Sequence, residues 1–257
     1  TEAIRRARRD WWTRVARGEL EGADLEAAAG LVRERLAAGP ARQAELVKLL
    51  TDRGYPRVVW NGIGLWVDMV RVPPSGTWER RRADLYGLAT EWLGPWKVEE
   101  GDAVEHLVRR YLAGFGPASL ADLGSWAAMP LTPLRPVLER VGTRRFRDEQ
   151  GTELFDLPDA PLPDPGTPAP PRFLSTWDAN LLVHARRTQL LPERHRSRIF
   201  HVRAPHSFPT FLVDGAVAGT WRHEHGRVHL EPFEPPAPAT RRELEDEAER
   251  LALFHQG

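Results

Sequence analysis

Residues 58–88 read VVWNGIGLWVDMVRVPPSGTWERRRADLYGL, and this stretch decides the predicted fold. Apolar residues at three-residue spacing predict a helix over Val58–Met69. An extended piece follows at Val70–Val72, then a Pro-Pro-Ser-Gly turn and a returning strand over Arg81–Leu88. The stretch therefore predicts a helix that leads into a β-hairpin. The apolar positions of the helix are Trp60, Ile63 and Trp66.

Two further helices precede this stretch. The first begins after Asp24, a residue type that caps helix N-termini, and ends near Gly39. The second is predicted over Ala41–Arg53 and stops at Gly54. Three helices followed by a hairpin are the element order of a winged helix, a helix-turn-helix variant. We therefore expect a winged-helix domain over residues 20–98.

The same order of elements recurs once downstream. A hairpin with a turn at 148–151 follows three helices, and Thr132 is a suitable cap for the last of them. We expect a second winged-helix domain over residues 99–158. The predicted helices are Ala103–Ala113, Ser119–Ala128 and Thr132–Val141, and the predicted strands are Arg144–Arg147 and Thr152–Leu157.

Residues 1–19 are predicted to form a leading helix. Its apolar positions fall at three- and four-residue spacing, at Ile4, Ala7, Trp11 and Val15. The helical pattern begins at once and no Met precedes it. We therefore expect this helix to be the remnant of a preceding unit and the chain to be a fragment.

The C-terminal part differs in character from the rest. Seven of the fourteen residues at 158–171 are proline, so residues 159–171 are expected to be an extended linker. Residues 172–257 alternate short strands with turns and end in a helix over Thr240–Phe254. We expect an α+β protein in which tandem winged-helix domains precede a small antiparallel β-barrel. The expected strands are Phe173–Leu174, Arg198–Val202, Thr210–Val213, Gly215–Trp221 and Arg227–Leu230, and the expected packing face of the last helix is Leu244, Ala248, Leu251 and Phe254.

Composition excludes several classes of protein. The chain has no Cys, which removes disulfide frameworks, thiol nucleophiles and Cys-ligated zinc. No apolar run is long enough for a membrane span, and no signal peptide, P-loop or dinucleotide-binding glycine pattern is present. We expect a cytoplasmic monomer without a cofactor or a membrane partner. The formal net charge is +0, so any nucleic-acid surface must be local.

Arginine dominates the basic residues, because all but Lys48 and Lys97 of the 36 are Arg. Arginine suits phosphate and guanine contacts, although GC-rich codon usage also explains the excess. Exposed polar residues on the predicted recognition helices and wings are the DNA-contact candidates. Trp78 at the hairpin tip is either a wedge between bases or a core residue. The candidates are Arg42, Gln43, Arg57, Trp78, Arg80, Arg81, Arg82, Arg135, Arg140, Arg144, Arg145 and Arg147.

Several histidines crowd the last predicted hairpin. His223 and His225 would share one face of a strand, with Glu224 between them and His229 nearby. Metal ligation needs at least a third ligand, and neither a cysteine nor a matched carboxylate completes the set. We therefore expect no metal site.

Four blocks of the chain belong together: Arg109–Leu123, Glu153–Pro161, Phe173–Arg187 and Leu212–Arg222. Together they resemble bacterial winged-helix DNA-binding proteins of the AlkZ/YcaQ kind. The resemblance implies three winged-helix units and a C-terminal barrel that clamp duplex DNA. Its characterised members excise N-alkylated purines and unhook interstrand crosslinks, with a Gln-x-Gln or Gln-x-Asp motif in the first unit.

The catalytic residues of that family are not found in this sequence. None of Gln43, Gln150, Gln189 and Gln256 begins a Gln-x-Gln or Gln-x-Asp triplet. If the protein has the motif, we expect it upstream of Thr1, together with the first unit. The block after Phe173 offers three candidates for a DNA cleft, or alternatively for a network that stabilises the barrel. These are Asp178, His184 and Arg187.

Three functions remain open on these grounds. The first is a DNA-repair glycosylase, or the DNA-clamping part of one, that acts on alkylated or crosslinked double-stranded DNA. The second is a noncatalytic DNA-binding or regulatory protein, which the missing glutamine motif favours. The third is a protein-interaction scaffold, which the neutral net charge favours.

Overall fold

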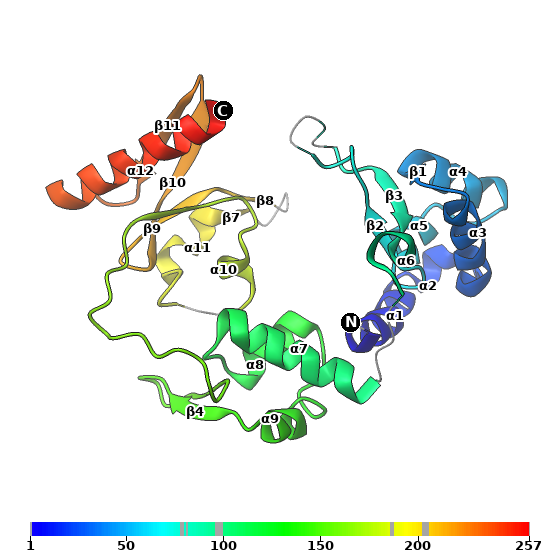
Figure 1. Ribbon diagram of the computed structural model, residues 1–257, viewed down its shortest axis with the longest axis horizontal. Helices are drawn as coiled ribbons and strands as arrows, with labels where there is room; N and C mark the ends of the chain where they lie inside the picture. The colour runs from blue at the N-terminus through cyan, green and yellow to red at the C-terminus, as the bar shows by residue number, and fades with distance from the viewer. Residues whose placement is uncertain are drawn as a thin grey trace. The chain divides into compact units, whose positions relative to one another are not determined.

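The computed structural model describes residues 2–77, 80, 82–95, 100–185, 188–201 and 206–256. It forms two compact units, Thr1–Leu107 and Val108–Gly257, and the boundary falls inside α7 (Glu100–Phe115). The five-part division expected from the sequence is finer than these two units and stays a prediction. Helices and strands are mixed in both units (Figure 1).

The first unit contains six helices and three short strands ahead of α7 in its described part. The helices are α1 (Glu2–Val15), α2 (Arg17–Leu20), α3 (Leu25–Ala37), α4 (Gln43–Asp52), α5 (Val59–Ile63) and α6 (Ala89–Leu93). The strands are β1 (Ala41–Arg42), β2 (Met69–Arg71) and β3 (Leu85–Leu88), in the antiparallel order β1-β3-β2.

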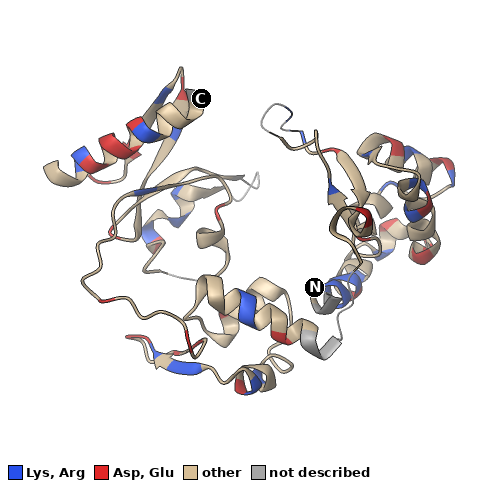
Figure 2. Ribbon diagram, in the orientation of Figure 1, with Lys and Arg blue, Asp and Glu red and all other residues tan. Residues whose placement is uncertain are grey.

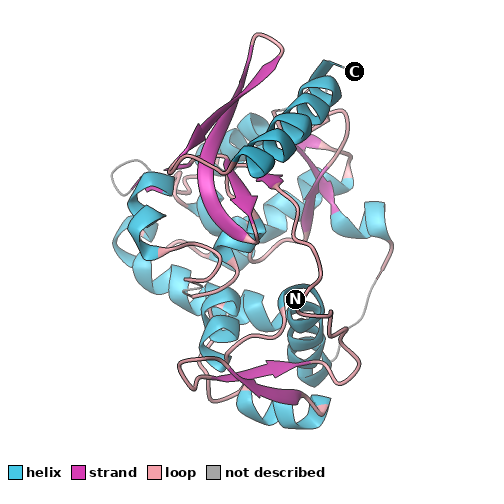
Figure 3. Cartoon of the chain, turned by 90° about the vertical axis from the view of Figure 1, so that its left-hand side faces the viewer, coloured by secondary structure: helices cyan, strands magenta, loops and turns pink. Residues whose placement is uncertain are grey.

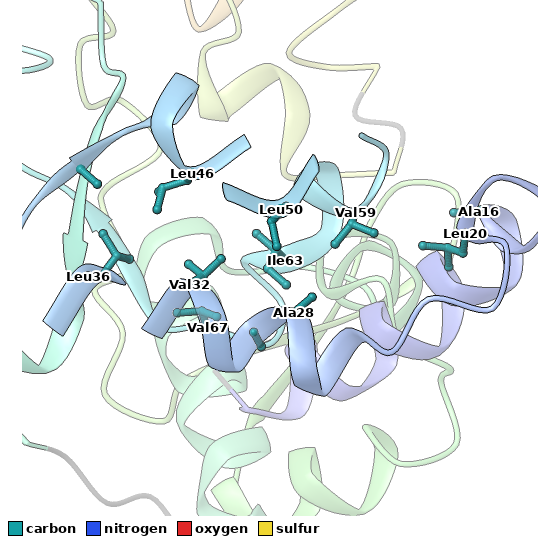
Figure 4. Close-up of a cluster of buried hydrophobic side chains, with 12 residues drawn as sticks. Ala16, Leu20, Ala28, Val32, Leu36, Leu46, Leu50, Val59, Ile63 and Val67 are labelled. Atoms are coloured by element: carbon teal, nitrogen blue, oxygen red, sulfur yellow. The ribbon is translucent and has the colours of Figure 1, made fainter. Parts of the chain in front are cut away.

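Helix α3 begins and packs as its sequence predicts. The Asp24 carboxylate accepts a hydrogen bond from the Ala27 N–H at 3.0 Å, which satisfies one of the unpaired donors at the helix start. Its apolar side is buried and packs against α4, α5 and β3. Figure 4 shows Val32 and Leu36 of α3 with Leu46, Leu50 and Ile63 in one core. Burial of this apolar surface is the main stabilising contribution to the unit.

The helix predicted over Ala41–Arg53 starts two residues later than expected. Ala41 and Arg42 form β1, which pairs with Tyr86 and Leu85 of β3. The Gln43 N–H also donates to the Asp84 carbonyl at 2.8 Å. These strand partners lie more than forty positions away in the sequence, so local periodicity could not reveal them.

The helix predicted over Val58–Met69 is also shorter. Helix α5 ends at Ile63, and Met69 instead pairs with Leu88 in the sheet. Gly62 and Gly64 weaken a helix here because glycine has the greatest backbone entropy to lose. Gly62 is also needed for packing, since an ideal Cβ there would lie 2.5 Å from the Trp12 ring.

The returning strand predicted over Arg81–Leu88 is shorter in the same way. It is confirmed only from Leu85 onward, as β3. The N–H groups of Asp84 and Leu85 donate to the Ser75 hydroxyl at 2.6 and 3.0 Å, so the chain is still part of the turn at that point. Arg81 lies outside the described residues.

The predicted apolar face of α1 was wrong by one residue. Trp11 and Val15 are 55% and 65% exposed, whereas Trp12 packs against the core and Ala16 is buried. The Trp12 ring meets Trp66 edge-on, with centroids 5.8 Å apart. The spacing of Trp11 and Val15 fits a helix face, but Trp12 fits the space above Gly62, and this tertiary contact sets the rotation of the helix.

The second unit continues from α7 with five helices and eight strands in its described part. The helices are α8 (Leu120–Ala127), α9 (Arg135–Val141), α10 (Ala179–Leu182), α11 (Glu193–Ile199) and α12 (Pro238–Gln256). The strands are β4 (Arg144–Arg147), β5 (Glu153–Asp156), β6 (Arg172–Leu174), β7 (Phe200–His201), β8 (His206–Ser207), β9 (Thr210–Val213), β10 (Ala216–Glu224) and β11 (Arg227–Pro232).

Capping explains where α8 and α9 begin. Ser119 and Asp122 form the reciprocal hydrogen bonds of a capping box at the start of α8. Helix α9 does not begin at Thr132, because a turn closes there through the Leu134 N–H and the Leu131 carbonyl at 3.1 Å. Leu134 is fully buried and anchors this turn, so the predicted Thr132 cap was wrong. The β4–β5 hairpin is confirmed, with Arg144 opposite Asp156.

The predicted β-barrel is an open sheet in the described part of the chain. Its strand order is β11-β10-β9-β6, and β7 pairs with β8 in a separate ribbon. Four strands are too few to close around a core, and the edge strand β6 has only three residues. Helix α12 packs against β11 instead (Figure 3).

Two further predictions in this unit need correction. Residues 198 and 199, expected in a strand, end α11, and only Phe200–His201 are strand before the chain leaves the described residues. On α12, Leu244 and Ala248 are buried as predicted and Leu251 is half-buried, but Phe254 is 69% exposed. In the last turn of α12 the neighbouring residue His255 packs on the sheet instead, through His223 of β10. None of the helices in the described ranges is long and apolar enough to cross a membrane.

Candidate nucleic-acid interface

Three of the predicted arginines of the first unit line one hollow beside the β2–β3 hairpin. Its volume is about 330 Å³. We call it the hairpin hollow. Its lining residues are Arg42, Pro74, Ser75, Arg80, Arg82, Asp84 and Leu85.

The hairpin hollow has an excess of positive charge. Arg42 Nη1 lies 3.2 Å from Asp84 Oδ1, and Arg82 Nε lies 3.3 Å from Asp84 Oδ2. The two arginine side chains are 48% and 87% exposed, whereas that of Asp84 is 17% exposed. With exposed Arg80, the described lining residues of the hollow carry three cations and one carboxylate. The arginines keep donors free of that carboxylate, because each guanidinium carries five N–H groups. An incoming anion such as a phosphate could be bound by these donors.

The Ser75 hydroxyl connects the two arms of the hairpin at the hollow. It accepts the two N–H bonds from Asp84 and Leu85 and donates to the Arg82 carbonyl at 2.9 Å. A neighbouring backbone bond joins the Gly76 N–H to the Arg80 carbonyl at 2.7 Å. This network holds the backbone of the arginine-bearing segment next to Arg42.

Replacing Ser75 by alanine is expected to loosen this segment. Two backbone donors would lose their acceptor, which should cost about 1–2 kcal/mol locally. We expect hydrogen exchange at the Asp84 and Leu85 amides to become about tenfold faster in the Ser75→Ala variant, measured by NMR. Ser175→Ala, which removes an exposed hydroxyl, is the control. Unchanged protection at both amides would contradict the assigned network.

The remaining candidates of the first unit lie outside the hairpin hollow. Gln43 is exposed at the first position of α4, and Arg57 is exposed in the turn before α5. Trp78 and Arg81 lie outside the described residues. The structure therefore brings together Arg42, Arg80 and Arg82 and leaves Gln43 and Arg57 apart from their hollow.

The arginines of the second unit divide into two groups. Arg144 donates to the Leu157 and Ala160 carbonyls at 3.2 and 2.5 Å and so holds the chain after β5. Arg145 pairs with Glu139 and Glu153 at 2.5 and 3.2 Å. Both make contacts within the unit, although Arg145 is also exposed, and Figure 2 shows the basic residues along β4. The other three candidates, Arg135, Arg140 and Arg147, are exposed.

The β4–β5 turn carries an anionic group beside these arginines. The Asp148 carboxylate accepts hydrogen bonds from the Gln150 and Thr152 N–H groups at 3.0 and 2.7 Å. Burial raises the pKa of Asp148, but these hydrogen bonds outweigh it and hold the pKa below its usual value. The turn therefore keeps a negative charge next to Arg147, which makes this hairpin less suited to phosphate than the hairpin hollow.

The two described members of the predicted cleft make structural contacts. Asp178 caps α10 by accepting the Asn180 N–H at 2.9 Å. His184 is half-buried, its Nε2 hydrogen-bonds with the Phe115 carbonyl at 3.1 Å, and its ring packs against Tyr111. These contacts support the alternative of a stabilising network. Arg187 lies outside the described residues.

The histidines of the β10–β11 hairpin do not converge. His225 lies in the turn with φ of 51°, because β10 ends at Glu224, so it does not share a strand face with His223. The His223 ring stacks on His255 of α12 with centroids 4.3 Å apart. His229 pairs with Arg222 across the hairpin. Within the described ranges, no three His, Asp or Glu residues form a group that could hold a metal.

Sequence reasoning missed two members of the hairpin hollow. Asp84 is the carboxylate shared by Arg42 and Arg82, and Ser75 is the hydroxyl that joins the hairpin arms. The Pro-Pro-Ser-Gly turn was a signal for Ser75, since serine often bonds to nearby backbone in turns. No feature of the neighbouring sequence indicates a role for Asp84, because its partner Arg42 lies 42 positions away.

The arrangement of helices and sheets places the chain in a known class of fold. It is similar to the solved structure of Streptomyces sahachiroi DNA glycosylase AlkZ, with a TM-score of 0.71 and 20% sequence identity. The match covers 94% of this chain and 68% of that chain. The chain thus has the fold of a DNA glycosylase. It belongs to the family described as DNA glycosylase AlkZ-like, whose model matches residues 1–254. A search of curated proteins finds no match.

Proposed function

We propose that this chain binds duplex DNA as a DNA-repair glycosylase or as the DNA-binding part of one. The observation that carries the proposal is the hairpin hollow, whose described lining has three arginines, Arg42, Arg80 and Arg82, against one carboxylate, Asp84. Membership of the AlkZ-like family supports it. The substrate we propose is duplex DNA with alkylated purines or interstrand crosslinks, bound by a cytoplasmic monomer.

We also propose that the first unit contains a winged helix. The order α3-β1-α4-α5-β2-β3, with β3 between β1 and β2, supports this. In such a domain a helix reads the major groove and the hairpin lies beside it on the backbone. Arg80 and Arg82 on the hairpin would then contact phosphates, and Gln43 and Arg57 are candidates nearer the bases. A second winged helix over α7, α8, α9 and the β4–β5 hairpin is proposed on the same element order.

The chemistry proposed for the whole protein needs few groups. Alkylation at purine N7 makes the base a good leaving group, so an enzyme has mainly to position water and stabilise a positively charged sugar. We assign no residue of this chain to that step, because no glutamine here begins the Gln-x-Gln or Gln-x-Asp triplet. The chain's own contribution is to hold the duplex through arginine–phosphate contacts.

The natural full-length protein provides the test of the proposed function. It would be incubated with a duplex that carries N7-methylguanine and with a crosslinked duplex, and base release would be measured by mass spectrometry. Undamaged duplex of the same sequence is the control. Release from the damaged duplexes is expected.

The outcomes separate the candidate functions. Tight duplex binding without release would favour a noncatalytic DNA-binding or regulatory protein, which the missing triplet makes the second candidate. Failure to bind any duplex, even at low salt, would overturn both and leave a protein-interaction scaffold.

A further inference from the structure

A second hollow lies in the other unit, against the open sheet. It has a volume of about 290 Å³ and lies among the start of α11, strands β9 and β10, and the chain between β11 and α12. Its walls are mostly apolar, with Phe211, Phe233 and several prolines and alanines. Its polar side chains are Arg194, His195, Glu234 and Thr240. We call it the His195 pocket.

His195 is a buried polar side chain without a structural role for its nitrogens. It is only 7% exposed and packs its ring against Phe233, with centroids 4.5 Å apart. Over the described part of the chain, no hydrogen bond joins either ring nitrogen to another protein group, and the side chain lines the pocket. The ring nitrogens are accessible from the pocket and are not sealed in the core. A ligand that enters the pocket can therefore bind them directly in place of solvent.

The charges around the pocket decide which partner fits. Burial lowers the pKa of His195, and the nearby charges of Arg194 and Arg198 lower it further against an opposing effect of Glu234. The ring is therefore neutral at pH 7 and offers one donor and one acceptor. At the rim Arg194 and Glu234 pair at 3.5 Å and balance each other. The Arg198 guanidinium lies 3.9 Å from the Phe233 ring centroid, so it is engaged there.

We propose that the His195 pocket binds a small, uncharged heteroaromatic molecule of nucleobase size. A net charge would be costly to desolvate between apolar walls and a balanced rim. The volume lies at the lower end for ligand pockets, which start at about 300 Å³, so the ligand is smaller than a typical drug. Aromatic and proline walls suit a flat ring. A ring edge that carries a donor beside an acceptor would satisfy both nitrogens of the neutral imidazole.

Adenine is the probe that meets these requirements. The full chain at pH 7.5 would be titrated with free adenine, followed by calorimetry and by NMR of ¹⁵N-labelled histidine side chains. We expect saturable binding and a shift of the His195 ring resonances. This proposal does not rest on DNA binding or base excision, because the titration contains no DNA.

Three variants test the role assigned to His195. His195→Phe keeps an aromatic ring but removes both hydrogen bonds, so adenine affinity should fall about tenfold or more. His195→Gln keeps a donor and an acceptor and should retain more of the affinity. Ala218→Leu adds bulk to the pocket wall and should abolish binding, with Ala38→Leu at the exposed end of α3 as its control.

Several results would overturn the proposal. One is the absence of saturable binding at millimolar adenine. Another is equal affinity of the native chain and the His195→Phe or Ala218→Leu variant. Equal binding of cyclohexanol would show a nonspecific apolar site. Thermal melts of each variant establish that it is folded. If His195→Phe does not fold, the Ala218→Leu and cyclohexanol measurements still test whether the pocket binds adenine specifically.

Discussion

Replacing Arg42, Arg80 and Arg82 together by alanine is expected to weaken duplex binding about 100-fold at low salt. Each lost phosphate contact should cost about 1 kcal/mol, and three such contacts correspond to roughly two powers of ten. The plot of log affinity against log salt should become shallower by about three, because each contact releases condensed counterions. Fluorescence anisotropy with an undamaged labelled duplex, over a series of salt concentrations, measures both quantities.

Two matched variants make this result specific to the hairpin hollow. Arg53→Ala removes an exposed arginine at the opposite end of α4 from Arg42 and should leave the affinity unchanged within about twofold. Asp84→Asn keeps the shape but removes the negative charge that pairs with Arg42 and Arg82, so binding should become several-fold tighter. An unchanged salt dependence in the triple variant, or weaker binding by Asp84→Asn, would contradict phosphate contact at this hollow.

Trp12→Ala is expected to destabilise the first unit by about 3 kcal/mol. The ring packs on the core and meets Trp66 edge-on, and truncating a large aromatic side chain leaves a cavity. Gly62→Ala should cost about 2 kcal/mol, because its Cβ would lie 2.5 Å from the Trp12 ring and the ring would have to move. Chemical denaturation followed by circular dichroism measures both values.

The double variant decides whether the two residues act through one contact. In a Trp12→Ala background the Gly62→Ala change meets no ring, so it should be neutral or stabilise by up to about 1 kcal/mol, as alanine favours helices over glycine. Gly30→Ala is the control, since its Cβ in α3 would meet no atom within 4 Å. If the two destabilisations simply add, Trp12 and Gly62 do not share a contact.

The arginines predicted to contact DNA have different environments at the two hairpins. Beside β2–β3, Arg80 and Arg82 lie near each other because they are only two positions apart in the chain, whereas the pairing of β1 with β3 brings Arg42 to them. On β4–β5 the sequence could not distinguish Arg147, which is exposed, from Arg144, which donates to two backbone carbonyls. Both are arginines on the same short strand. They differ in environment only because the chain that follows β5 passes next to Arg144 and offers it two carbonyl groups.

The sequence by itself determined the helices α3, α8 and α12, the cap at Asp24 and the turn at 148–151. These features depend on groups within a few positions of one another, so local residue types encode them. Only the tertiary structure decided which side of α1 is buried, that Ala41 and Arg42 form a strand, and that Asp84 joins Arg42 and Arg82. Each of these depends on a contact between residues some forty to fifty positions apart, such as Trp12 with Gly62, and no local periodicity carries that information.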